Sequence, residues 1–157
     1  MLDADALNCV AKQPEILLRK KAPIIITPHP GEMSRLTGLA TPLVNAERER
    51  VALDFTQKYG VVTVLKGAGT VIASPNGKVL VNPTGNSGMA TGGSGDVLAG
   101  MTASILAQGA SAFSSAAAAV YLHGLAGDIA AEKYGKISML PTDLINCIPL
   151  AYKRCGF

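Results

Sequence analysis

Short apolar runs alternate with longer segments of mixed apolar and polar residues along the first half of the chain. Residues 22–27 and 61–65 are mostly apolar, and we expect each run to form a buried strand. Residues 30–38 and 45–59 have the composition of helices, and a glycine is placed to end each of them, at 38 and at 60. Strands that alternate with helices predict an α/β fold.

The second half begins with a predicted hairpin and continues as helices. Two apolar runs, residues 70–73 and 78–81, flank Ser74-Pro-Asn-Gly77, and Asn-Gly between such runs is a strong hairpin signal. We expect three further helices, over about residues 95–108, over about residues 112–133, and from Pro141 or Thr142 to about residue 153. Neither an internal repeat nor a linker interrupts the pattern, so residues 1–157 are expected to belong to a single domain.

The segment from residue 82 to residue 100 carries more glycine than a packed element tolerates. The amides of Gly93, Ser94 and Gly95 can turn inward together, and the helix that follows adds free N–H groups and the positive end of its dipole. These groups predict an anion site. A carboxylate beside a bound phosphate would only weaken binding, so Asp96 at the rim predicts a general base.

Two common phosphate loops do not fit this segment. The Gly-x-x-x-x-Gly-Lys-Ser/Thr loop needs a lysine after its last glycine, and Asp96 occupies that position. A dinucleotide fingerprint opens a βαβ unit and places its acid about 20 residues later, whereas this loop comes late and holds its acid inside the motif. A helix N-cap role would account for Asp96 alone, but it leaves the preceding glycines unexplained.

The motif Gly93-Ser-Gly-Asp96 resembles the Gly-x-Gly-Asp signature of the ribokinase-like superfamily, in which the glycines form an anion hole and the Asp deprotonates an acceptor hydroxyl. Other segments narrow the resemblance to the ADP/ATP-dependent NAD(P)H-hydrate dehydratases. In chain order they are Asp3-Ala-Asp-Ala-Leu-Asn8, Thr27-Pro-His-Pro-Gly-Glu-Met33, Lys66-Gly-Ala-Gly-Thr70, Asn86-Ser-Gly-Met-Ala90 and His123-Gly-Leu-Ala-Gly-Asp128. The resemblance implies a ribokinase-like, Rossmann-type layered sheet with helices on both faces. It also implies a metabolite repair reaction, the dehydration of hydrated NAD(P)H to NAD(P)H with release of phosphate.

The resemblance further implies roles for individual residues. Asp96 would be the catalytic base and contact the substrate, and His29 would contact the hydrated substrate. ADP or ATP would be the co-substrate, with Mg²⁺, towards which Asp3 and Glu32 are candidate contacts through water. The residues implied to line the adenine nucleotide are Lys66, Gly67, Ala68, Gly69, Thr70 and Gly95, with Asn86 bordering its phosphates.

Several of these residues also have a purely structural interpretation. His29 lies between two prolines, where a rigid turn accounts for the sequence, and residues 66–70 have the composition of a turn. Asn82 and Asn86 carry amides that serve turns as readily as ligands. For three residues we favour a structural role, namely packing or capping for His123 and a helix surface or cap for Asp128 and Asp143.

Two alternatives to the dehydratase remain open from sequence. A small-molecule kinase of the same superfamily would use the same Asp on an acceptor that keeps its phosphate, and a catalytically inactive fragment would only bind nucleotide. In the resembling family several βα units, including sheet strands, precede the motif that begins at Asp3. We therefore expect a partial domain, or one part of a split protein, that carries the nucleotide half of the site and lacks part of the substrate half.

Composition bears on the partners and the cellular compartment expected for the protein. A net charge of +3 gives no reason to expect nucleic acid as a partner, and three cysteines without metal-ligand spacing favour a reducing compartment. The most apolar region, residues 99–131, is broken by polar residues, and no basic-then-apolar leader is present, so we expect a cytoplasmic protein without a membrane partner. The resemblance implies a homo-oligomer, commonly a tetramer.

Overall fold

The computed structural model describes residues 1–157 as a mixed α/β fold around one sheet of four short strands. The strands lie side by side in chain order: β1 (Ile25–Ile26), β2 (Val62–Leu65), β3 (Val71–Ala73) and β4 (Val79–Val81). β1 and β2 are parallel, whereas β2, β3 and β4 pair in antiparallel order. Leu2 adds a single parallel bridge to Ile26 of β1. The predicted strands and the predicted hairpin are therefore confirmed.

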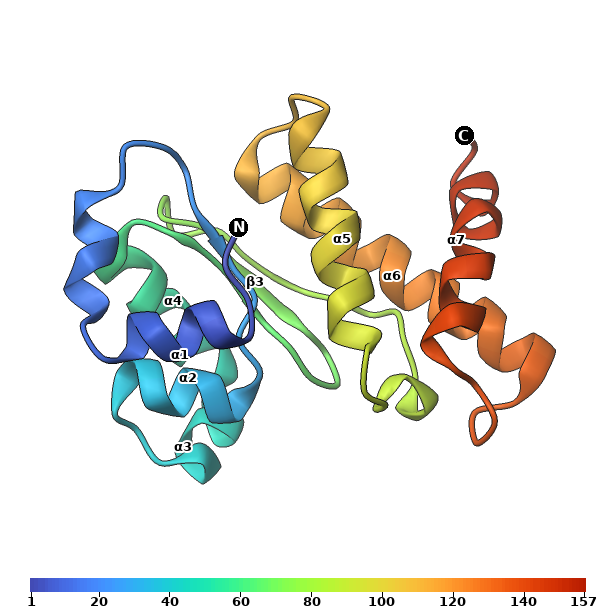
Figure 1. Cartoon of the computed structure of the whole chain (residues 1–157), viewed down its shortest axis with the longest axis horizontal. Helices are drawn as coiled ribbons and strands as arrows, with labels where there is room; N and C mark the ends of the chain where they lie inside the picture. The colour runs from blue at the N-terminus through green and yellow to red at the C-terminus, as the bar shows by residue number, and fades with distance from the viewer.

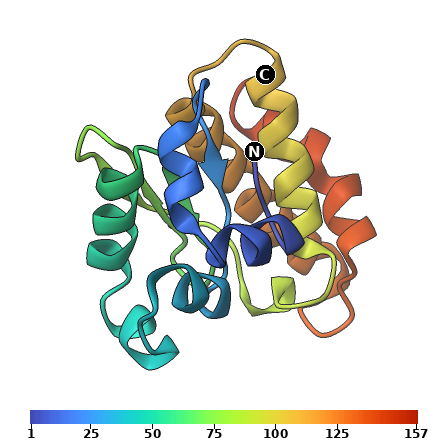
Figure 2. The ribbon, with the colours of Figure 1, turned by 60° about the vertical axis from the view of Figure 1, so that its left-hand side comes forward.

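Helices cover both faces of this sheet (Figure 1). One layer holds α1 (Asp5–Ala11), the 3₁₀ segment η1 (Pro14–Arg19), α2 (Pro30–Thr37), α3 (Thr41–Ala46) and α4 (Arg48–Tyr59). The other layer holds α5 (Ser94–Ala107), α6 (Ala112–Tyr134) and α7 (Pro141–Arg154), with the short η2 (Ser87–Met89) before α5. Figure 2 shows the first residues of the chain, in dark blue, passing close to the N-terminal end of α5.

The alternation of side chains along the strands explains the two layers. Successive residues of a strand point to opposite faces, so an apolar run supplies both faces with core residues. Ile25, Val62, Val64 and Ile72 pack with α5, α6 and α7 in one buried cluster. Their neighbours Ile26, Leu65, Val71 and Ala73 pack with the helices of the first layer in the other cluster. The prediction of helices on both faces of the sheet is confirmed.

The single helix predicted over residues 45–59 is wrong. The chain forms α3 and α4 instead, and Glu47 separates them with φ −127° and ψ 42°, outside the helical region. Pro42 starts α3 earlier than the amphipathic pattern indicated, because proline fits the first turn of a helix, where its missing N–H costs nothing. α4 then begins at Arg48, whose side chain contacts the end of β2 and the loop that follows it.

No helix of the protein combines the length and the apolar character needed to cross a membrane.

Two glycines of α6 allow η2 and the loop before it to lie directly on the helix. A methyl group at Gly124 would lie 2.8 Å from the carbonyl carbon of Thr84, and one at Gly127 would lie 2.8 Å from Cγ of Met89. Contacts this short force the backbone or the side chain to move. Because Thr84 Oγ1 also donates to the Tyr121 carbonyl at 2.9 Å, the loop cannot simply shift away from the helix.

We expect Gly124→Ala to lower the free energy of unfolding by about 1–2 kcal/mol, although alanine favours helices, because the methyl group overlaps the Thr84 backbone. Gly100→Ala in α5 is the matched control, since nothing lies within 4 Å of its added methyl group. That variant should gain up to about 1 kcal/mol from helix propensity. Urea unfolding of both variants measures the difference, and equal effects would contradict the close contact.

Candidate active site

A cavity of about 770 Å³ opens where the ends of β1 and β2 meet the N-terminal end of α5. β1 leads into His29 and β2 leads directly into Lys66, while the hairpin returns the chain to the glycine-rich loop. Segments far apart in sequence thus share one wall, as expected for the carboxyl ends of strands in an α/β sheet. Among its lining residues are the predicted His29, Lys66, Gly67, Ala68, Gly69, Thr70, Asn86, Ser94 and Gly95.

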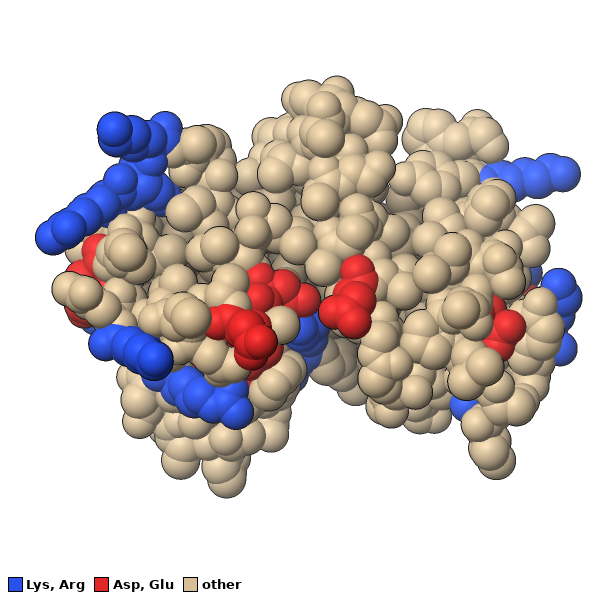
Figure 3. All heavy atoms as spheres, in the orientation of Figure 1, with Lys and Arg blue, Asp and Glu red and all other residues tan.

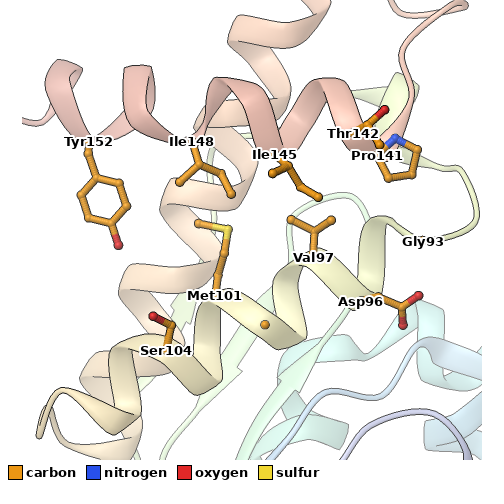
Figure 4. A pocket seen from close by; sticks show the side chains of 11 residues that line it. Gly93, Asp96, Val97, Met101, Ser104, Pro141, Thr142, Ile145, Ile148 and Tyr152 are labelled. Atoms are coloured by element: carbon orange, nitrogen blue, oxygen red, sulfur yellow. The ribbon is translucent and has the colours of Figure 1, made fainter.

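Gly93 and Asp96 line a second, neighbouring cavity of about 630 Å³ between α5 and α7. Figure 4 shows Val97 and Met101 of α5 facing Ile145 and Ile148 of α7 across this cavity, while the Asp96 carboxylate points away from α7. Asp96 is exposed in the first turn of α5, next to Gly95 in the wall of the first cavity. The predicted base therefore stands at the border between the two cavities.

The glycine-rich loop presents free amides at the start of α5. Gly93 has φ 94°, a left-handed conformation that favours glycine, and it forms the N-cap of α5. The Ser94 N–H donates to the Thr91 carbonyl at 3.3 Å, whereas the N–H groups of Gly93, Gly95 and Asp96 have no acceptor in the protein. Free amides at the positive end of a helix dipole bind anions.

Lys66 brings a positive charge to the same place. Its Nζ would lie 3.5 Å from a Cβ at Gly95, so the ammonium group borders the start of α5. It donates to Asp3 Oδ1 at 2.8 Å and lies 3.8 Å from Glu32 Oε2, which is buried. The sequence left Asp3 and Glu32 without a known partner. The structure places both beside Lys66. Figure 3 shows acidic and basic side chains next to one another near the middle of the face in view.

His29 is held by the turn that follows β1. Its Nδ1 accepts from the N–H groups of Gly31 at 3.0 Å and Glu32 at 3.3 Å, and Glu32 Oε2 accepts from the His29 N–H at 2.7 Å in return. This reciprocal capping starts α2. Because Nδ1 acts as an acceptor, the neutral imidazole carries its proton on Nε2. The side chain is 50% exposed. His29 therefore both caps α2 and lines the cavity.

Asp128 holds the loop that carries Asn86. Its two carboxylate oxygens accept from the Gly85 N–H and from Asn86 Nδ2, each at 2.9 Å, and Asn86 Oδ1 accepts from the Gly88 N–H at 3.0 Å. Asp143 accepts from the Leu140 N–H at 2.9 Å and caps α7, as expected. From the sequence we expected Asp128 only at a helix surface or cap. Its position at the end of the family motif 123–128 is the one sequence feature that could have indicated its role in holding this loop.

His123 lies buried behind the glycine-rich loop, which fits the structural role expected for it. Its Nε2 is 2.9 Å from the Ser94 carbonyl, which ties α6 to the first turn of α5. Burial lowers the pKa of His123 from 6.5 to about 4, although the hydrogen bond to Ser94 acts in the opposite direction. The ring is therefore neutral near pH 7, and the neutral imidazole donates from Nε2.

The lowered pKa of His123 predicts a loss of stability in acid. Between about pH 6.5 and pH 4 the unfolded chain binds the proton and the folded chain does not, so the free energy of unfolding decreases as the pH falls through this window. At about 1.4 kcal/mol per pKa unit the loss reaches about 3 kcal/mol. Urea unfolding at several pH values measures it, and His123→Asn should show a flatter profile. An identical slope in both proteins would show that His123 is not the titrating group.

Solved structures of other proteins share this fold. A ribokinase-like superfamily protein from Enterococcus faecalis V583 superposes with a TM-score of 0.80 and 33% identity, over 97% of this chain and 51% of the other. The protein thus belongs to the ribokinase-like class of α/β folds. Residues 1–150 match the family described as NAD(P)H-hydrate dehydratase, and the chain is a member of that family.

Two relatives show how much of the family's length the chain spans. The bifunctional NAD(P)H-hydrate repair enzyme Nnr of Moorella thermoacetica is 46% identical over 98% of this chain and 29% of its own length. The ADP/ATP-dependent NAD(P)H-hydrate dehydratase of Bacillus subtilis, co-crystallised with ATP/Mg²⁺, superposes with a TM-score of 0.81 at 37% identity. That comparison covers 84% of this chain and 48% of the other. The chain spans about half or less of the length of each of these proteins.

Proposed function

We propose that this chain supplies the nucleotide half of a site that dehydrates hydrated NAD(P)H at the expense of ADP or ATP. The single observation that supports it most is the cavity of about 770 Å³, which gathers His29, the loop Lys66–Thr70 and the start of α5. The free amides at the start of α5 and the ammonium group of Lys66 suit phosphate groups. The names of the two relatives agree with this substrate and co-substrate.

The chemistry that follows is phosphoryl transfer used to make a leaving group. Hydroxide leaves a hydrated nicotinamide ring badly, whereas phosphate leaves well. Asp96 takes the proton of the ring hydroxyl as the terminal phosphoryl group of the nucleotide is transferred to the hydroxyl oxygen. Phosphate then departs with the C–O bonding electrons, and loss of a proton from the neighbouring ring carbon to water re-forms the ring double bond. The free N–H groups of Gly93, Gly95 and Asp96 stabilise the charge on the transferred group. His29 holds the substrate ring near this position.

Magnesium is the metal that this reaction implies. No group of three or more His, Cys, Asp or Glu side chains converges in the structure, which fits an ion held mainly by nucleotide oxygens and water. Asp3 and Glu32 are the carboxylates that could contact its waters, because both lie beside Lys66 at the edge of the cavity. The ion would neutralise charge between nucleotide phosphates.

The direct test is to incubate the purified protein with hydrated NADH, Mg²⁺ and either ADP or ATP, and to follow NADH absorbance. Recovery of NADH with release of phosphate supports the dehydratase and identifies the nucleotide used. A phosphorylated acceptor without recovered NADH would indicate a small-molecule kinase. ADP binding without turnover would indicate a nucleotide-binding part that needs the remaining part of the family fold.

The cytoplasm remains the proposed compartment. Cys9, Cys147 and Cys155 are all unpaired, which agrees with a reducing environment. A homo-oligomer is proposed from the family resemblance alone.

A further inference from the structure

The loop Lys66–Thr70 needs external support to keep one shape. Gly67 has φ 145° and Gly69 has φ 62°. Two of the five residues of the loop therefore have positive φ angles, which glycine adopts about as readily as negative ones. The Lys66 N–H donates to the Pro28 carbonyl at 2.8 Å and fixes the base of the loop. Thr70 Oγ1 donates to the Gly67 carbonyl at 3.0 Å and closes it internally. Neither bond holds the tip against the rest of the protein.

Arg48 supplies the missing contacts. Its Nη2 donates to the Leu65 carbonyl at 2.8 Å and reaches the Gly69 carbonyl at 3.5 Å, so one guanidinium group spans both ends of the loop. A Cβ at Gly67 would lie 2.7 Å from Nη1 of Arg48, which shows that the guanidinium group lies directly against the Gly67 backbone. Arg48 is the first residue of α4, whose packing against the sheet sets its position.

Arg48 acts from behind the loop. Ala68 and Gly69 line both the cavity of about 770 Å³ and another cavity of about 450 Å³, so the loop is the wall between the two. Arg48 lines only the smaller one. The guanidinium group therefore lies on the side of the loop away from the proposed nucleotide, and a direct contact with a ligand in the larger cavity is not required of it.

The hydrogen bonds of Arg48 also set the direction of a peptide group. Every peptide bond in the chain is trans, so the C=O and N–H of each peptide point in opposite directions. Because the Gly69 carbonyl is turned back towards Arg48, the N–H of Thr70 is turned away from it. This N–H has no acceptor in the protein, and Thr70 lines the larger cavity. It is a free donor on the nucleotide side of the loop.

An arginine at this position is costly for the fold. Its Nε is buried without a hydrogen-bond partner, and burial lowers the pKa of the guanidinium group. A buried donor that lacks an acceptor destabilises a protein, so an apolar side chain of similar length would suit folding at least as well. What an arginine does here and an apolar side chain could not do is donate to the Leu65 and Gly69 carbonyls.

We propose that Arg48 is a positioning residue for the nucleotide site, which holds the loop Lys66–Thr70 from behind and directs the Thr70 N–H into the larger cavity. This inference rests on the proposed nucleotide-binding function. The nucleotide is recognised as an acceptor for that N–H, an adenine nitrogen or a ribose or phosphate oxygen. Arg48 itself contacts only the loop, and the loop contacts the nucleotide.

Loop order in the free protein provides the first test. In ¹⁵N heteronuclear NOE measurements the amides of Gly67, Ala68 and Gly69 should be as rigid as the sheet in the wild type and mobile in Arg48→Met. Arg50→Met is the matched control, because Arg50 lies on the same helix, is exposed, and pairs only with Glu47 and Asp54. Equal rigidity of the loop in Arg48→Met and in the wild type would overturn the proposal.

ADP titration by calorimetry provides the second test. Arg48→Met should weaken ADP binding by about ten- to hundredfold with an unchanged melting temperature, and Arg50→Met should leave it unchanged. Arg48→Lys, which keeps the charge and can reach one carbonyl, should recover part of the affinity. Wild-type affinity in Arg48→Met would overturn the proposal. A wild type that fails to bind ADP would instead overturn the proposed function, while the loop dynamics still report independently on Arg48.

Discussion

In the proposed dehydration, replacing Asp96 by asparagine is expected to lower the rate by about 10²–10⁴-fold and to leave the affinity for ADP unchanged. Asparagine has nearly the same shape as aspartate but cannot accept the proton of the ring hydroxyl. The exposed side chain of Asp96 makes no hydrogen bond that the fold depends on, and its backbone N–H remains at the start of α5. The change therefore removes the base and keeps the anion site.

The Asp96 variant is measured by NADH recovery at saturating ADP and by calorimetric titration of ADP. Asp5→Asn is a suitable control, because Asp5 is also an exposed aspartate in the first turn of a helix, α1, outside the cavities. It should retain full turnover. Normal turnover in Asp96→Asn would remove Asp96 from its role as base. A loss of ADP affinity equal to the loss of turnover would mean that the carboxylate serves binding instead.

The parts of the fold that sequence predicted are those with a local signal. Apolar runs marked the strands, Asn76-Gly77 marked the hairpin, and Gly38 and Gly60, both with positive φ, ended α2 and α4 where expected. The break between α3 and α4 was missed because glutamate is common inside helices, so Glu47 gives no sequence signal of a helix end.

The convergence of His29, Lys66 and Gly95 was predictable for a different reason. Strand ends in an α/β sheet meet at one edge, so motifs that follow strands gather there once the order of elements is known. The partners of these residues could not be predicted in the same way. Lys66 and Asp3 are 63 residues apart, and Arg48 reaches carbonyl groups that carry no sequence signal at all. Such contacts depend on the relative placement of helices, which periodicity does not specify.

Replacing Lys66 by methionine is the second change with a large expected effect. We expect ADP affinity to fall by about a hundredfold, because a charge-assisted contact to phosphate is lost at the start of α5. The variant should also lose about 2 kcal/mol of stability. Asp3 and the buried Glu32 would lose the ammonium group that both carboxylates now contact, and removal of one partner of such a cluster destabilises the fold.

A double variant separates these two consequences. Glu32→Gln removes one of the two negative charges next to residue 66, so Lys66→Met combined with Glu32→Gln should recover most of the stability lost in Lys66→Met. It should not recover ADP affinity, because the positive charge beside Gly95 is still absent. Urea unfolding and ADP titration of both variants measure the two quantities. Recovery of both together would mean that Lys66 serves the fold through Glu32 and makes no contact of its own with the nucleotide.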